Sequence, residues 1–342
     1  MLDTGKNDGP KSSSGAAFVM EILVSILIWY SSSAVANTTA RKLLTAVPMP
    51  VLLTLSQFVT ATIFGFVSLQ ILKLKPIREV PAEAREPLLK LTVVYTLGFL
   101  FVNAGYVVVN VSLAETLRSA EPLVTVVLAL FFLKSEPVSK LEMYSMAPIV
   151  LGGALSSLGD SSFSGLGLLF VCISNLSFSL RSMYTKKLKQ VYDGDAFNVF
   201  YRVSSMGMVL LVTLLVVLEV LGTVAEFFWV VEENLSSAPK VQHHYTVRSN
   251  LDMLVNANMF KLAILNGVTY VIYNQTSFYV LSRVRMVTHG VANAFRRVVT
   301  ILFSVWYFGN HVSTINAFGI TLAIAGVVLY AKAKDYAASS PK

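Results

Sequence analysis

The feature that most constrains this fold is a series of apolar stretches, each long enough to cross a lipid bilayer. A transmembrane helix needs about 20 mainly apolar residues. Of the 342 residues, 55% are hydrophobic and 13% are charged, against about 25% charged in an ordinary soluble domain. We therefore predict an all-α polytopic membrane protein with ten transmembrane helices, at 16–38, 50–72, 91–111, 113–133, 141–158, 165–185, 197–221, 257–281, 286–308 and 312–331.

The net charge of +8 does not indicate a nucleic-acid-binding protein, because the basic residues punctuate the apolar stretches and form no single stripe. They gather instead in the links that share a side with the two termini, such as the basic link 73–90. The opposite side receives few, among them Arg41 and Lys42. By the positive-inside rule, both termini are expected on the cytosolic side of the membrane, or its equivalent in an organelle.

The sequence offers no cofactor or metal site. The single cysteine, Cys172, excludes an intramolecular disulfide, and the four histidines lack the spacing of metal ligands. The N-terminal tail carries no cleavable signal, so either the first helix directs insertion or a presequence is missing.

Two halves of the chain resemble each other. Glu136-Pro-Val-Ser139 aligns with Asn310-His-Val-Ser313, and Val150-Leu-Gly-Gly153 aligns with Ile324-Ala-Gly-Val327. Five helices in each half is an odd number, so the halves must be inserted in opposite orientations. Inverted repeats are typical of secondary transporters, whose substrate binds near the membrane midplane. We expect a tail at 1–15, repeats at 16–158 and 165–331, a mobile loop at about 226–255 and a tail at 332–342.

Two adjacent arginines, Arg296 and Arg297, lie near the middle of the ninth apolar stretch. Each charge at that depth costs roughly 2.5–3.5 kcal/mol on insertion scales, so the pair is not expected to face lipid. Snorkelling to the headgroups fits poorly, because both residues lie about ten residues from either end. The pair predicts an anion site inside the bundle.

The fourth stretch carries a second charged cluster, Glu115, Arg118 and Glu121, followed by Pro122. One interpretation is a local ladder of ion pairs three residues apart at the membrane interface. The other is that Arg118 faces the same cavity as the arginine pair. The nearby proline would bend the helix and free a backbone carbonyl group, whose hydrogen bond only protein or water can supply. We favour the second interpretation. Arg181, near the end of the sixth stretch, is interpreted as a local ion-pair partner or a snorkelling residue.

Several segments resemble one family, and they do so in the correct order along nearly the whole chain. They are Ser112…Thr116-Leu-Arg118-Ser-Ala-Glu-Pro122, Ala147-Pro-Ile-Val-Leu-Gly152, Ile173-Ser-Asn through Lys187, Tyr273-Asn-Gln275 and Val287-Thr-His through Val299. The family is that of the plastid phosphate translocators, or triose-phosphate translocators, in the drug/metabolite transporter superfamily.

The resemblance implies an antiporter with ten helices that exchanges inorganic phosphate for phosphorylated C3, C5 or C6 metabolites. Carried over residue by residue, it implies phosphate binding by Arg118, Arg296 and Arg297, with Tyr273 near the substrate. The family usually has lysine at the first two of these positions. An arginine keeps the charge and adds a planar fork suited to phosphate oxygens.

Further departures from the family lie beside the expected site. Plastid members often place a histidine and a Thr or Ser on helix three, where this chain has Phe99 and Val102, so both positions are expected near the substrate. The histidine of helix four is replaced by Glu115. Residues expected to gate or tune the site are Glu115, Thr116, His289 and Asn293.

The expected partners are inorganic phosphate, organic phosphates and the lipid bilayer, with no nucleic acid, and the chain is expected to be a monomer or weak dimer. A plastid envelope is the favoured location, with a Golgi or ER membrane as the alternative. A nucleotide-sugar transporter of the secretory pathway is the second hypothesis, because a short N-terminal tail fits it. A membrane scaffold without transport is the third, and the insertion cost of buried arginines argues against it. The chain is not expected to be an enzyme.

Overall fold

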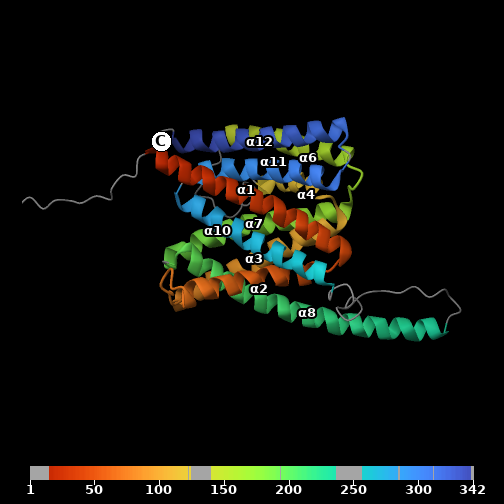
Figure 1. The fold of residues 1–342 in the computed structure, drawn as a ribbon. Coiled ribbons are helices and arrows are strands. Elements are labelled where there is room, and N and C mark those ends of the chain that lie inside the picture. The colour runs from red at the N-terminus through yellow and green to blue at the C-terminus, as the bar shows by residue number, and fades with distance from the viewer. Residues whose placement is uncertain are drawn as a thin grey trace, which may run out of the picture.

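The computed structural model describes residues 15–121, 123–124, 140–192, 194–235, 256–283, 286–310 and 312–339. Within these residues the chain is helical, and its helices lie side by side in one bundle (Figure 1). They are α1 (Gly15–Ala46), α2 (Pro50–Phe66) continued by the π-helix η1 (Val67–Ile71), α3 (Ala82–Val108), α4 (Val111–Arg118), α6 (Lys140–Gly159), α7 (Gly165–Val191), α8 (Ala196–Leu235), α10 (Ala257–Arg283), α11 (Met286–Phe308) and α12 (Thr314–Ser339).

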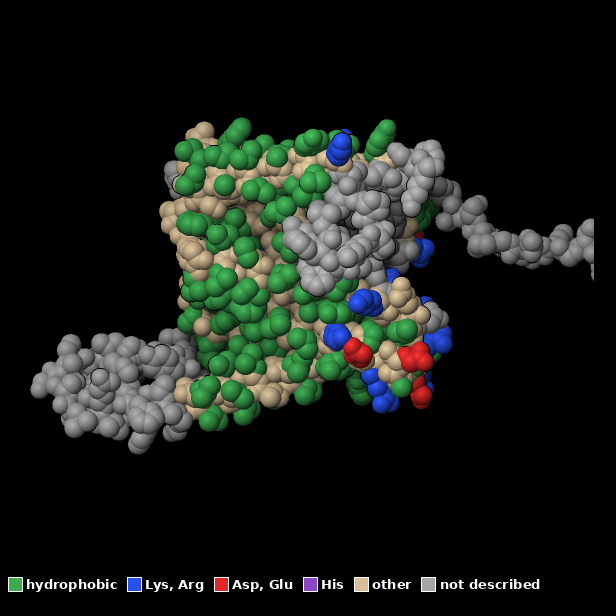
Figure 2. All heavy atoms as spheres, turned by 180° about the vertical axis from the view of Figure 1, so that it is seen from behind, with side chains coloured by type: hydrophobic (Ala, Val, Ile, Leu, Met, Phe, Trp, Pro, Cys, Tyr) green, Lys and Arg blue, Asp and Glu red, His purple; other side chains and the backbone are tan. Residues whose placement is uncertain are grey.

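The surface of the bundle suits a bilayer. Five of the described helices are long and apolar enough to cross a membrane, and two shorter apolar helices lie at Met143–Gly159 and Thr314–Tyr330. Figure 2 shows a face covered by hydrophobic side chains, with the charged side chains gathered toward one end. Exposed lysines and arginines lie just after η1, at the start of α3 and near the end of α7. They include Lys73 and Lys75, Arg85, and Lys189, respectively. The structure therefore agrees with a polytopic membrane protein.

Many contacts between helices occur in symmetric pairs: a contact of this kind has a counterpart in which each helix is replaced by the corresponding helix of the other half of the chain. Helix α1 packs along α10 as α3 packs along α7, and α1 contacts α11 as α7 contacts α4. In the same way α2 contacts α10 as α8 contacts α3, and α11 contacts α12 as α4 contacts α6. The helices expected to be fourth and ninth, α4 and α11, contact each other directly.

Helices α6 and α12 form the most extensive contact in the bundle, and glycines make it close. A Cβ atom on Gly152 would lie 2.6 Å from the carbonyl oxygen of Gly319, and one on Gly326 would lie 2.7 Å from the backbone nitrogen of Ile149. Residues later in α6 meet residues earlier in α12, as Gly159 does with Asn316. The two helices are therefore antiparallel, and only glycine lets their backbones approach this closely.

A break between α3 and α4 positions the charged cluster of α4. Helix α3 ends at Val108, and Arg41 of α1 donates hydrogen bonds to the carbonyl oxygens of Tyr106 and Val107. These carbonyls end a helix and lack partners within it, so a cation from another helix is well placed to satisfy them. The chain then restarts as α4 after Asn110, whose backbone nitrogen donates to Ser162 Oγ at 3.0 Å.

Several helix ends differ from the hydropathy-based expectation: α1 ends later, at Ala46, and α3 begins earlier, at Ala82. Helix α8 continues to Leu235, so the first part of the expected loop 226–255 is helical, and the rest lies outside the described residues. Helix α12 continues to Ser339, so most of the expected tail 332–342 is helical as well. The described part of the fourth helix ends at Arg118, and 125–133 of the expected span lies outside the described residues.

Candidate functional site

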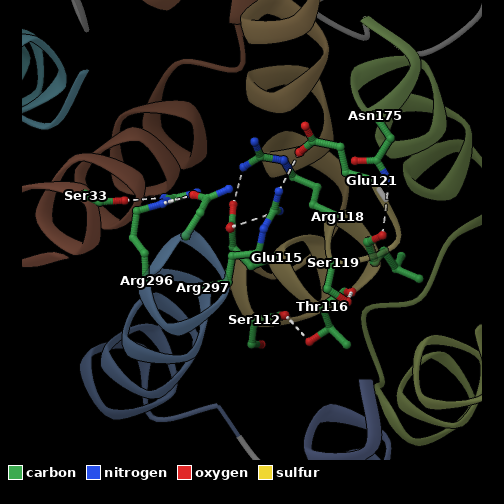
Figure 3. A network of polar contacts seen from close by, with 12 residues as sticks. Ser33, Ser112, Glu115, Thr116, Arg118, Ser119, Glu121, Asn175, Arg296 and Arg297 are labelled. Atoms are coloured by element: carbon green, nitrogen blue, oxygen red, sulfur yellow. Dashed lines mark hydrogen bonds and ion pairs between the residues drawn. The ribbon is translucent and has the colours of Figure 1, made fainter. Parts of the chain in front are cut away.

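A cavity of about 80 Å³ lies inside the bundle, between helices from both halves of the chain. All three arginines expected to bind phosphate line it, and so do Tyr273, Phe99, Val102 and Asn293. Figure 3 shows how Arg296 and Arg297 of α11 approach the charged residues of α4. The sequence-based expectation that α4 and α11 share one cavity is therefore consistent with the structure.

Arg118 is buried against two groups. Its Nη1 forms an ion pair with Glu115 Oε1, and its guanidinium lies 5.3 Å from the ring centroid of Phe178. Tyr106 donates a hydrogen bond of 2.7 Å to the same oxygen of Glu115. The ion pair between residues three apart forms as one interpretation anticipated, and both of its side chains are buried in the bundle.

Arg297 joins the two helices electrostatically. Its Nη2 donates to Glu121 Oε2 at 2.7 Å, and its Nη1 lies 3.7 Å from Glu115 Oε2 without a hydrogen bond. Arg297 is 5% exposed and Glu115 is fully buried. A buried ion pair is costly to break by removing one partner, so these carboxylates hold the arginine in place while no anion is bound.

Arg296 is held by neutral groups. Its Nε donates to Asn293 Oδ1 at 2.9 Å, and its Nη1 donates to Ser33 Oγ of α1 at 2.5 Å (Figure 3). Among the described residues, neither bond supplies a carboxylate partner for the guanidinium charge. An external anion can therefore serve as the counter-ion of Arg296.

A fourth arginine lines the cavity. The guanidinium of Arg181 lies 5.6 Å from the ring of Tyr95 and 5.1 Å from that of Phe178. This finding corrects the interpretation of Arg181 as a snorkelling residue, because the side chain lines the cavity and stacks on aromatic rings. Of the described residues, four arginines line the cavity and two glutamates pair with them, so the site carries a net charge of about +2.

The remaining predicted residues have different surroundings. Glu115 is a buried counter-ion, and Thr116 donates to the carbonyl oxygen of Ser112 at 2.8 Å without lining the main cavity. His289 belongs to α11, but its side chain lies outside the described residues. Within the described part of the chain, no group of three or more His, Cys, Asp or Glu residues could hold a metal ion.

Several lining residues escaped the sequence analysis. They are neutral and polar: Asn37 of α1, Gln57 of α2 and Asn103 of α3, with Ser33 behind Arg296. Gln57 donates to Asn266 Oδ1 at 2.9 Å and accepts from Asn103 at 3.1 Å. A polar residue in an apolar stretch is a visible signal, but it indicates helix packing as readily as a ligand contact.

Comparisons with known proteins agree with these features. The profile of the Triose-phosphate Transporter family matches residues 20–331. The chain is 30% identical over 316 residues to the triose phosphate/phosphate translocator, non-green plastid, chloroplastic, of Brassica oleracea var. botrytis, covering 92% of this chain and 73% of the relative. It is 29% identical over 318 residues to phosphoenolpyruvate/phosphate translocator 1, chloroplastic, of Arabidopsis thaliana, covering 92% and 72%.

A crystal structure at 14% sequence identity shares the fold. Its TM-score is 0.52, and the match covers 96% of this chain and 100% of that one.

Proposed function

Because this chain belongs to the Triose-phosphate Transporter family, we propose that it exchanges inorganic phosphate for phosphorylated C3, C5 or C6 metabolites across a membrane. The chain is a transporter and not an enzyme. The observation that carries the proposal is that Arg118, Arg296 and Arg297, from two different helices, line one buried cavity. Relatives named as translocators of triose phosphate or phosphoenolpyruvate against phosphate support the same class of reaction.

The phosphate group of the substrate binds among these three arginines. Guanidinium forks offer paired N–H donors to phosphate oxygens, and in a site removed from water such charge-assisted bonds are strong. Tyr273, Phe99 and Val102 contact the rest of the substrate, while Glu115, Thr116, His289 and Asn293 tune or gate the site. This assignment is supported by the position of Tyr273, Phe99, Val102 and Asn293 in the cavity wall.

Transport proceeds by alternating access between two inverted five-helix repeats. The exchangeable helix contacts and the antiparallel α6–α12 pair support this arrangement, as does the position of the cavity between both halves. Rocking one repeat against the other exposes the cavity to each side in turn. The protein lies in a plastid envelope membrane, with both termini on the cytosolic side, where the exposed basic residues gather.

Exchange in proteoliposomes tests this function. Vesicles loaded with phosphate should take up labelled phosphate and triose phosphate, and they should take up nucleoside monophosphate far more slowly. Arg297→Ala should reduce exchange by more than about tenfold, because it removes a phosphate partner and breaks the pair with Glu121. The exposed Arg85 lies outside the cavity, so Arg85→Ala is the matched control and should retain exchange.

Two outcomes would contradict the proposal. Preferential uptake of nucleoside monophosphate would favour a nucleotide-sugar transporter. If Arg297→Ala kept more than about half of the wild-type exchange rate, the arginine cavity would not be the phosphate site.

A further inference from the structure

The cavity is lined by both charged and neutral polar side chains. The arginines that bind phosphate come from α4 and α11, and several amide side chains come from other helices, among them α1, α2 and α3. Helix α1 contacts one of these arginines and carries one of these amides. Ser33 accepts a hydrogen bond from Arg296, and Asn37 lies one turn further along the same helix face, about 6 Å away along the axis. A short phosphate ester spans such a distance.

The side chain of Asn37 has an unused donor. It is 8% exposed and lines the cavity, yet its Nδ2 atom has no hydrogen-bond partner. Buried amide nitrogens are nearly always paired, so an unpaired one beside a cavity indicates a partner that arrives with a ligand. A hydroxyl or carbonyl oxygen is the acceptor that such a donor requires.

Asn103 complements this donor with an acceptor. Its Nδ2 donates to Thr54 Oγ1 at 2.9 Å and to Gln57 Oε1 at 3.1 Å. Because the amide nitrogen is used in this way, the group that Asn103 offers to a ligand is its carbonyl oxygen. Gln57 is itself bonded to Asn266, so Asn103 is held in a fixed orientation. A hydroxyl group, which both donates and accepts, matches the two asparagines.

The charge of the cavity points to the same class of ligand. Four arginines and two glutamates leave about +2 among the described residues, and a phosphate monoester dianion balances this charge. A phosphate ester that also carries a carboxylate would leave one negative charge uncompensated, and an uncompensated charge is costly away from water.

We propose that Asn37 and Asn103 bind the uncharged, hydroxyl- or carbonyl-bearing end of a phosphate ester whose phosphate lies against Arg118, Arg296 and Arg297. The preferred substrates are then hydroxylated phosphate monoesters and not phosphorylated carboxylates. This inference rests on the proposed phosphate exchange.

The test compares three exchange rates in the same phosphate-loaded vesicles, with external labelled phosphate, dihydroxyacetone phosphate and phosphoenolpyruvate. The wild type should exchange dihydroxyacetone phosphate at least about fivefold faster than phosphoenolpyruvate. Asn37→Leu, which is similar in size, and Asn103→Ala should each lower the ratio of dihydroxyacetone phosphate to phosphate exchange by at least about fivefold. The ratio corrects for differences in insertion and in the fraction of active protein.

Two controls separate binding from structure. Asn316 is a buried amide of α12 that pairs with Ser156 and Asp160 and does not line the cavity. Asn316→Ala should leave the ratio unchanged. Asn37→Leu should not lower the melting temperature in detergent, because the amide nitrogen that it removes has no partner in the protein.

The outcomes distinguish this inference from the proposed function. If the wild type exchanges phosphate but transports phosphoenolpyruvate as fast as dihydroxyacetone phosphate, the inference is overturned and the exchange function stands. An unchanged ratio in both Asn37→Leu and Asn103→Ala overturns it in the same way. Absence of phosphate-for-phosphate exchange in the wild type would overturn the proposed function and this inference together.

Discussion

Arg118 and Arg296 both line the cavity, but their guanidinium groups are used differently. Arg118 makes one ion pair through Nη1, and its Nε has no partner. Arg296 uses both Nε and Nη1, toward Asn293 and Ser33. A lysine can replace a single point of positive charge, but it cannot reproduce a fork that contacts two side chains in different directions.

Lysine substitutions should therefore affect the two positions unequally. Arg118→Lys should retain exchange with an affinity for phosphate weaker by about 1 kcal/mol, or roughly fivefold. Arg296→Lys should lose more, because it also frees Asn293 and Ser33. Phosphate affinity can be measured from the concentration dependence of exchange in proteoliposomes. Complete inactivity of Arg118→Lys, or equal loss at both positions, would contradict this account.

At the level of single residues, the sequence reveals charge better than neutral polarity. Arg118, Arg296 and Arg297 could be predicted because a charged residue within an apolar stretch is costly to insert into a membrane and therefore indicates a function. Ser33 and Asn37 could not, since serine and asparagine often serve packing in membrane helices. The pairing of Glu121 with Arg297 is a contact between helices far apart in the chain, which spacing along one helix cannot predict.

Among the helices, α6 and α12 depend most on the absence of a side chain. Gly152 and Gly153 are neighbours in α6 but differ in surroundings. A Cβ on Gly152 would lie 2.6 Å from Gly319 O, whereas one on Gly153 would lie 3.7 Å from Leu117 Cδ2, an ordinary van der Waals contact.

This difference predicts unequal effects of the same substitution. Gly152→Ala should destabilise the protein by about 1–3 kcal/mol, because the two backbones must separate to admit a methyl group. Gly153→Ala is the matched control and should have little effect. Thermal unfolding in detergent measures both. Equal melting temperatures for the two variants would show that α6 and α12 are not so closely packed.

The membrane-spanning character of several helices could be predicted from apolar length, because a bilayer imposes a minimum span. Their ends could be predicted less well. Helix α8 passes the expected end at residue 221 and continues to Leu235. Outside the bilayer a helix needs no continuous apolar stretch, so hydropathy gives no signal for where it stops.

For the molecule as a whole, the proposed exchange function predicts that the charge inside the bundle links phosphate binding to the conformational change. Glu115 and Glu121 form ion pairs with arginines of the cavity, so the net charge of the cavity is less positive than the arginines alone would make it. The remaining charge still opposes closure away from water, and a bound phosphate dianion removes that obstacle.

Exchange should therefore be obligatory. Vesicles without internal phosphate should show almost no uptake of labelled phosphate, and internal phosphate should raise the rate at least about tenfold, or roughly 1.4 kcal/mol on the barrier. A neutral sugar inside the vesicle should not replace phosphate, because it cannot balance the arginines. Substantial uptake into empty vesicles, or equal stimulation by neutral sugar, would refute the electrostatic explanation of coupling.

The length of α8 has a practical consequence for imaging. Its 40 residues extend about 60 Å, about twice the hydrocarbon thickness of a bilayer, and the end of the helix projects beyond the other helices (Figure 1). A small protein enclosed in a detergent micelle offers few landmarks for aligning particle images. A rigid helical protein fused in register to the outer end of α8 would provide such a landmark while leaving the arginine cavity untouched.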